Sequence, residues 1–131
     1  MKEPIAISVR RTQLGRARGL GAGGGLHHWQ ALKVTSLALV PLTLWFVYAM
    51  VSLAGHPQED VAAWASHPVN AALLLALVAM TFHHMALGLQ NVLEDYVHDK
   101  RMRGLSILGV KAISGLLGLM AGVAVLKLAL I

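Results

Sequence analysis

An imidazole in the middle of an apolar segment is the first feature of this sequence that could do chemistry. The stretch "TFHHMALGLQNVLEDYVHD" carries two adjacent histidines at the end of a long apolar run. On a helix, His84, Gly88, Asn91 and Asp95 fall on one face. A neutral imidazole nitrogen can bind the iron of a haem, and a glycine one turn away leaves room for a flat macrocycle. The spacing leaves two interpretations open, a cofactor ligand or a hydrogen bond to a neighbouring helix.

The far end of this face carries an acid and a phenol. Eleven residues of helix separate His84 from Asp95, or roughly 16 Å along the axis. If Asp95 marks the cytoplasmic boundary of a membrane, His84 lies near mid-membrane and Tyr96 lies at headgroup level. A phenol there can donate a hydrogen bond to a ligand that enters from the bilayer, although tyrosine at an interface is also an ordinary anchoring residue. His83 lies about 100° around the helix and is the weaker candidate for a ligand.

Two lysines also lie within apolar segments. Lys33 follows the sequence "HHW" at the start of the first segment, and Lys111 lies inside the last. A lysine in this position commonly extends its ammonium to the membrane interface. The alternative for each is pairing with an anionic group, such as the propionate of a haem.

These residues must be positioned by membrane-spanning helices. The chain has 131 residues, of which 56% are hydrophobic and 13% are charged, whereas a soluble domain carries about 25% charged residues. Apolar runs over about residues 31–53, 68–93 and 105–131 each exceed the roughly 20 residues that cross a bilayer as a helix. We therefore predict an all-α membrane protein with three transmembrane helices. The absence of cysteine excludes disulfides, zinc–thiolate sites, cysteine-ligated iron–sulfur clusters and covalently attached haem within this chain.

The distribution of charge predicts the orientation of the helices. Lysine and arginine are concentrated in a basic, glycine-rich tail over residues 1–25 and in the second connection, near Arg101. The first connection has Glu59 and Asp60 but no basic residue, so the N-terminus is expected in the cytoplasm and the C-terminus on the periplasmic side. The cytoplasmic location also accounts for the basic residues, so they do not indicate that the chain binds nucleic acid. Residues 26–131 form the predicted membrane domain, with Asp60 expected to cap a short helix at the outer interface.

Two motifs resemble a known family. The sequence "HHW…KVTSLALVPL", the three-span layout and "HHMALGLQNVLEDYVHD" together resemble the hydrophobic membrane anchor subunit of bacterial succinate dehydrogenase. The resemblance implies a second three-span anchor subunit of the cytochrome b type and one b-type haem held between two histidines, one from each chain. It also implies a flavoprotein and an iron–sulfur subunit on the cytoplasmic side, and a ubiquinone site.

The same resemblance assigns roles to individual residues. His84 matches the haem iron ligand, and Gly88, four residues further on, is part of the motif that carries the resemblance. Asp95 and Tyr96 match an Asp–Tyr pair whose tyrosine hydrogen-bonds the quinone carbonyl. Lys33 stands where relatives commonly have an arginine beside a haem propionate, and it lacks the bidentate fork of that residue.

The function expected from the resemblance is that of an anchor in the bacterial plasma membrane. It is a non-catalytic subunit of succinate:quinone oxidoreductase with no complete active site of its own. Alternatives are the anchor of a fumarate reductase, which runs the reverse reaction, a small transporter with a His83–His84 proton relay, and a purely structural assembly subunit. The transporter is disfavoured because the sequence shows no inverted repeat and no interrupted helix.

Overall fold

A computed structural model describes residues 26–131. Within this range the chain forms four helices, which are α2 (Leu26–Leu53), α3 (Gln58–Ser66), α4 (Pro68–Tyr96) and α5 (Lys100–Leu130). Of these, α2, α4 and α5 are long and apolar enough to cross a membrane. The predicted all-α fold with three spans is confirmed. The predicted tail over residues 1–25 lies outside the described residues.

The helices are longer than the apolar runs predicted. Helix α2 begins at Leu26 rather than near residue 31, α4 continues to Tyr96, and α5 begins at Lys100. A helix can extend past the hydrocarbon core into the headgroup layer. Its backbone N–H and C=O groups then stay hydrogen-bonded to one another within the helix. The turn between α4 and α5 is closed by Asp99, whose side chain accepts from the backbone N–H of Arg101 at 3.2 Å.

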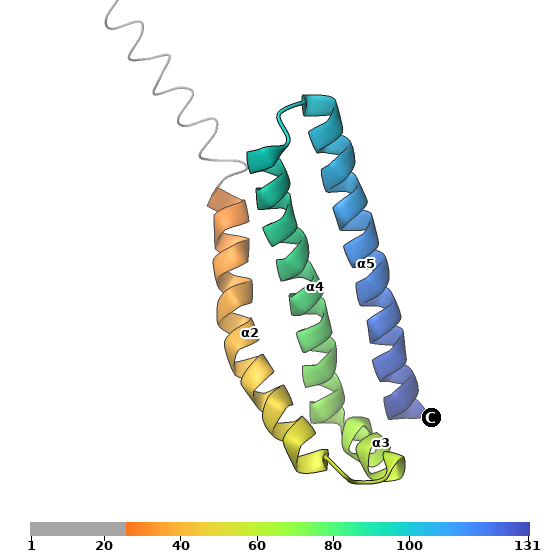
Figure 1. The fold of residues 1–131 in the computed structure, drawn as a ribbon. Helices are drawn as coiled ribbons and strands as arrows, with labels where there is room; N and C mark the ends of the chain where they lie inside the picture. Colours follow the sequence, from red (N-terminus) through yellow and green to blue (C-terminus); the bar gives the residue numbers. More distant parts are fainter. Residues whose placement is uncertain (1–25) are drawn as a thin grey trace, which may run out of the picture.

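The three long helices lie in a row, with α4 in the middle (Figure 1). Consecutive helices run antiparallel, so α4 packs against α2 on one side and α5 on the other. Among the described residues, those that are buried are Thr35, Ala49, Ala65, Leu74 and Ser114. Most large apolar side chains are therefore on the surface, as expected where lipid or another membrane subunit surrounds them.

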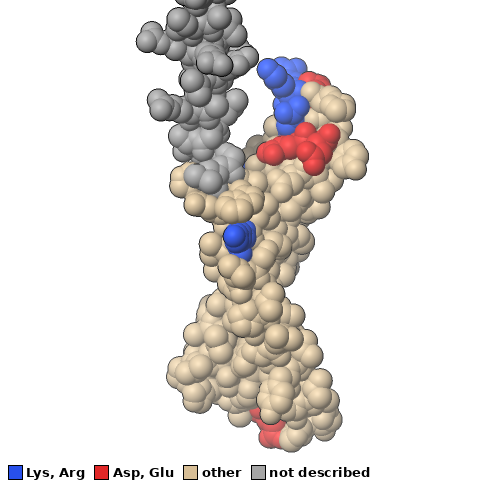
Figure 2. Space-filling model, turned by 90° about the vertical axis from the view of Figure 1, so that its left-hand side faces the viewer, with Lys and Arg blue, Asp and Glu red and all other residues tan. Residues whose placement is uncertain are grey.

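Charge is distributed along the long axis of the molecule. On the face that Figure 2 shows, acidic and basic side chains gather mainly toward the two ends, with a largely uncharged band between them. One end holds the α4–α5 turn with Asp95, Asp99 and Arg101, and the other holds Glu59 and Asp60 on α3. The uncharged band is the part of the molecule suited to the hydrocarbon core of a bilayer.

The connection between α2 and α4 is organised around two tryptophans. The ring of Trp64 on α3 stacks against that of Trp45 on α2, with 5.6 Å between ring centroids. The side-chain amide of Asn70 donates to the carbonyl of Trp64 at 2.9 Å and ties α3 to the start of α4. These contacts hold the short helix against the ends of two spans.

One expectation for this connection was wrong. Pro57, not Asp60, stands at the N-cap of α3, and it provides no side-chain hydrogen bond. Asp60 lies in the first turn, where acids are favoured by the helix dipole, and its carboxylate contacts His56 Nδ1 at 3.1 Å. The expectation that α4 starts at Pro68 is confirmed, with His67 as its N-cap.

A glycine of α5 lies close against α4. A Cβ added to Gly118 would lie 3.3 Å from Cβ of Phe82, an atom fixed to the backbone of α4. Four residues further along, a Cβ added to Gly122 would lie 3.9 Å from Cδ2 of Leu75, at the far end of a flexible side chain. Gly118 therefore leaves little room for a side chain between the two helices at this point.

We predict that Gly118→Val lowers the stability of the protein by about 1–3 kcal/mol, because the added methyl groups overpack against Phe82. The matched control is Gly122→Val, which makes the same change in the same helix against a side chain that can move. Thermal denaturation of the detergent-solubilised protein measures both. Equal effects of the two substitutions would show that the Gly118 contact does not limit the packing of α4 on α5.

Candidate functional site

The imidazole of His84 meets a hydroxyl from the neighbouring helix. Its Nδ1 lies 2.8 Å from Oγ1 of Thr35 on α2. Thr35 is only 4% exposed, whereas His84 is half-buried. The Thr35 hydroxyl also lies within hydrogen-bonding distance of two carbonyls of its own helix, those of Ala31 at 2.7 Å and Leu32 at 3.0 Å. The ring is thus held by one of its two nitrogens at the seam between α2 and α4.

A second polar pair joins the same two helices closer to the α4–α5 turn. Nε2 of His28 is hydrogen-bonded to the amide oxygen of Asn91. His28 and Asn91 are each seven residues, or roughly 10 Å along a helix axis, from Thr35 and His84 respectively. Two polar contacts at matched spacing fix the register of α2 against α4. Asn91, which shares the polar face predicted for His84, therefore serves the packing of this seam.

The surface beside His84 is open at Gly88. A Cβ added to Gly88 would meet no atom within 4 Å, so no side chain of the described residues fills this space. Gly88 lies one turn from His84 on nearly the same face of α4. The arrangement keeps a flat region of helix surface next to an imidazole, as expected for a planar group stacked against the backbone.

The two adjacent histidines face different sides of α4. His84 contacts α2, whereas His83 lines a cavity of about 400 Å³ between α4 and α5. The walls of this cavity include Gln90, Lys111 and Ser114. The structure thus brings His83 and Lys111 to one cavity, which their separation in the sequence could not indicate.

Lys33 is not brought next to His84. It lies two residues before Thr35, which is about 200° around α2 and away from the seam. Its side chain is exposed, with Nζ 4.9 Å from the centre of the Trp29 ring in a cation–π contact. The role predicted for Lys33 beside a propionate stays a prediction, since this contact leaves the ammonium on the outer surface of α2.

Asp95 and Tyr96 form the last two residues of α4, and both are exposed. The phenol of Tyr96 is 78% accessible. The turn that follows is held by Arg103, whose guanidinium donates to the carbonyls of Val97 at 3.0 Å and His98 at 3.3 Å. The end of α4 is therefore clamped while the phenol itself is available to a ligand or a partner.

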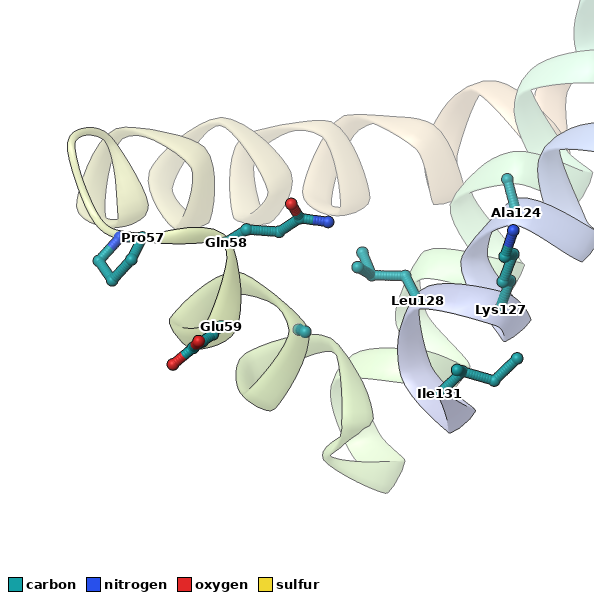
Figure 3. Close-up of a pocket in the computed structure, with 8 residues that line it drawn as sticks. Pro57, Gln58, Glu59, Ala124, Lys127, Leu128 and Ile131 are labelled. Atoms are coloured by element: carbon teal, nitrogen blue, oxygen red, sulfur yellow. The ribbon is translucent and has the colours of Figure 1, made fainter.

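A larger cavity lies at the opposite end of the molecule. It has a volume of about 670 Å³ and is formed between α3 and the end of α5 (Figure 3). Gln58, Lys127 and Leu128 contribute to its walls, and none of the predicted site residues does. The candidate site is instead a surface on α4.

Thr35, His28 and Asn91 are the site residues for which sequence analysis assigned no partner. A signal was present, because His28 and Thr35 are spaced by seven residues, as are His84 and Asn91. Equal heptad spacing on two antiparallel helices allows both pairs to meet. The pairing itself depended on how α2 is rotated and shifted against α4, which this spacing does not determine.

Known proteins are similar to this chain in sequence. The sequence profile of the succinate dehydrogenase/fumarate reductase transmembrane subunit family matches residues 8–118. The succinate dehydrogenase hydrophobic membrane anchor subunit of Rickettsia bellii is 31% identical over 105 residues, which cover 79% of this chain and 84% of that protein. The subunit of the same name from Rickettsia typhi is 30% identical over 87 residues, covering 66% and 70% of the two chains.

A relative from another genus is similar to the same degree. The corresponding subunit of Paracoccus denitrificans is 32% identical over 82 residues, covering 61% of this chain and 63% of that protein. No solved structure matches the chain. Because the profile spans most of the sequence and the relatives agree in name, the chain belongs to the family of succinate dehydrogenase and fumarate reductase transmembrane subunits.

Proposed function

We propose that this chain is the membrane anchor of a succinate:quinone oxidoreductase, shares a b-type haem with a second anchor subunit, and contributes to the ubiquinone site. The observation that carries the proposal is the His84 imidazole, held by Nδ1 about halfway along an apolar span. An ionisable side chain at this depth is costly unless it has a function or a partner. One nitrogen of the ring has its partner, and the other is available.

The residues around His84 fit a haem. The ring supplies a nitrogen donor, and the space at Gly88 admits a planar group against the α4 backbone. Family membership favours a second axial ligand from the partner anchor. When bound, the haem supplies a one-electron iron couple. This chain contributes the ligand nitrogen, its orientation and an apolar surrounding that excludes water.

Quinone binding is assigned to the cytoplasmic end of α4. The exposed phenol of Tyr96 can donate a hydrogen bond to a quinone carbonyl, and the adjacent Asp95 can orient the phenol or accept a proton. The clamp made by Arg103 on the α4–α5 turn limits the motion of this end of the helix. A pre-positioned donor contributes more than a mobile one, because less conformational freedom is lost when the quinone binds.

The partners follow from the exposed surfaces. The flat row of three helices leaves large apolar side chains of α4 exposed, among them Met85, Leu89 and Val92, which suits a second three-span subunit of the cytochrome b type. The cytoplasmic end would receive the iron–sulfur and flavoprotein subunits, which pass electrons from succinate toward quinone. A proton relay through both histidines is disfavoured, because His84 faces α2 whereas His83 faces the α4–α5 cavity.

We expect His84→Ala to abolish the low-spin b-type haem signal in the reduced-minus-oxidised visible spectrum of the purified complex, because an axial nitrogen is lost. The control is His83→Ala, which removes the neighbouring imidazole from the other side of α4 and should leave the spectrum unchanged. A wild-type complex without haem, or a His84→Ala complex with an unaltered spectrum, would contradict the assignment of the ligand.

Tyr96→Phe is expected to lower succinate:ubiquinone reductase activity about tenfold to a hundredfold, since an unmade hydrogen bond costs about 1–3 kcal/mol. Succinate oxidation with a soluble dye acceptor should be unaffected, because it does not use the quinone site. Tyr48→Phe is the matched control, since Tyr48 is 76% exposed and lies near the end of α2 that is far from Tyr96. Unchanged quinone reduction in Tyr96→Phe would remove the phenol from the proposed site.

The proposed orientation can be tested because the chain contains no cysteine. Gln58→Cys, on α3, should react with a membrane-impermeant maleimide in intact spheroplasts. Met102→Cys, at the start of α5, should react only in inverted vesicles, because basic residues favour the cytoplasmic side. The reverse labelling pattern would contradict the proposed topology.

A further inference from the structure

We propose that Thr35 is a positioning residue that holds His84 as the tautomer with hydrogen on Nδ1 and so presents Nε2 as the ligand for iron. The inference rests on the proposed function, because it concerns how this chain prepares its haem ligand. It begins from the contact of 2.8 Å between Thr35 Oγ1 and His84 Nδ1 at the α2–α4 seam.

The direction of this hydrogen bond follows from the surroundings of the hydroxyl. A threonine hydroxyl has one hydrogen to donate, whereas a backbone carbonyl can only accept. Oγ1 of Thr35 lies 2.7 Å from the carbonyl oxygen of Ala31 and 3.0 Å from that of Leu32. The hydrogen is therefore directed to α2, and the lone pairs of Oγ1 face His84. The hydroxyl accepts, and Nδ1–H donates.

This direction determines which nitrogen of His84 can bind a metal. A neutral imidazole carries one hydrogen, so a donating Nδ1 leaves the lone pair on Nε2. If the hydroxyl donated to Nδ1 instead, the hydrogen of the ring would be on Nε2 and that nitrogen could not bind iron. Thr35 is buried and tied to two carbonyls of its own helix, so the acceptor is fixed in position. Such outer contacts orient a histidine ligand and raise its basicity.

The hydrogen bond has a consequence that a purely structural contact between helices would not have. Donation from Nδ1–H increases the electron density on Nε2, which favours the more positively charged ferric iron. Loss of the acceptor should therefore shift the midpoint potential of the haem upward. A contact that only holds α2 against α4 could change stability when it is removed, but it would not systematically favour reduced haem.

The adjacent residue supplies a matched control. Ser36 donates its hydroxyl to the carbonyl of Leu32 at 2.8 Å, as Thr35 can, but it is exposed and its hydroxyl does not contact α4. Ser36→Ala removes a hydroxyl from the same turn of α2 without affecting His84. Thr35→Val keeps the shape of the side chain and removes the acceptor, whereas Thr35→Ser keeps the acceptor and removes a methyl group.

The experiment is a redox titration of the haem in the purified four-subunit complex, followed by visible spectroscopy, for wild type and the three variants. We expect Thr35→Val to raise the ratio of reduced to oxidised haem at a fixed ambient potential by roughly fivefold or more, and to weaken haem retention about tenfold. Thr35→Ser and Ser36→Ala should titrate like wild type. Dye-linked succinate oxidation confirms that each complex is assembled.

The outcomes separate this inference from the proposed function. A wild-type complex without low-spin haem would overturn both. A wild-type complex with haem and a Thr35→Val complex that titrates identically would overturn the role of Thr35 alone. If Thr35→Val does not assemble, Thr35→Ala takes its place. If neither assembles, pulsed electron paramagnetic resonance of the ferric wild type must detect exchangeable hydrogen on the remote nitrogen of His84, and its absence would overturn the inference.

Discussion

Hydrogen-bond satisfaction in a medium without water is the constraint on which the rest of this structure depends. The backbone meets it by forming helices throughout the apolar segments, which is why α2, α4 and α5 can be long although few of their side chains are buried. Polar side chains at the same depth must meet it too. The pairs Thr35–His84 and His28–Asn91 do so across α2 and α4, and they define the register of these helices.

The seam between α2 and α4 therefore combines packing with the preparation of a site. The same contact that satisfies one nitrogen of His84 directs the other away from the hydroxyl, toward whatever occupies the surface of α4. Gly88 keeps that surface flat, and no side chain of the described residues covers it. On the other side of α4, Gly118 brings α5 close to Phe82, so the central helix is held from both sides.

This chain supplies only half of the proposed site, because its three long helices lie in one flat row. Three helices in a row expose both faces of α4, so they cannot enclose a cofactor as a four-helix arrangement can. Family membership supports a second anchor as the missing wall. The proposed quinone site follows the same principle, because Tyr96 lies exposed at the end of a helix whose following turn is held by Arg103.

The sequence by itself determined the three spans, the position of His84 within the second, the glycine beside it and the Asp–Tyr end. Each depends on composition and on spacing within one helix, where geometry is known in advance. Helix ends were placed less well, because capping and continued backbone hydrogen bonding, not hydropathy, set them. Only the tertiary structure decided that Thr35 meets His84, that His28 meets Asn91, and that His83 shares a cavity with Lys111. These contacts join residues up to 63 positions apart, and they depend on the rotation and shift of one helix against another, to which many side chains contribute small energies at once.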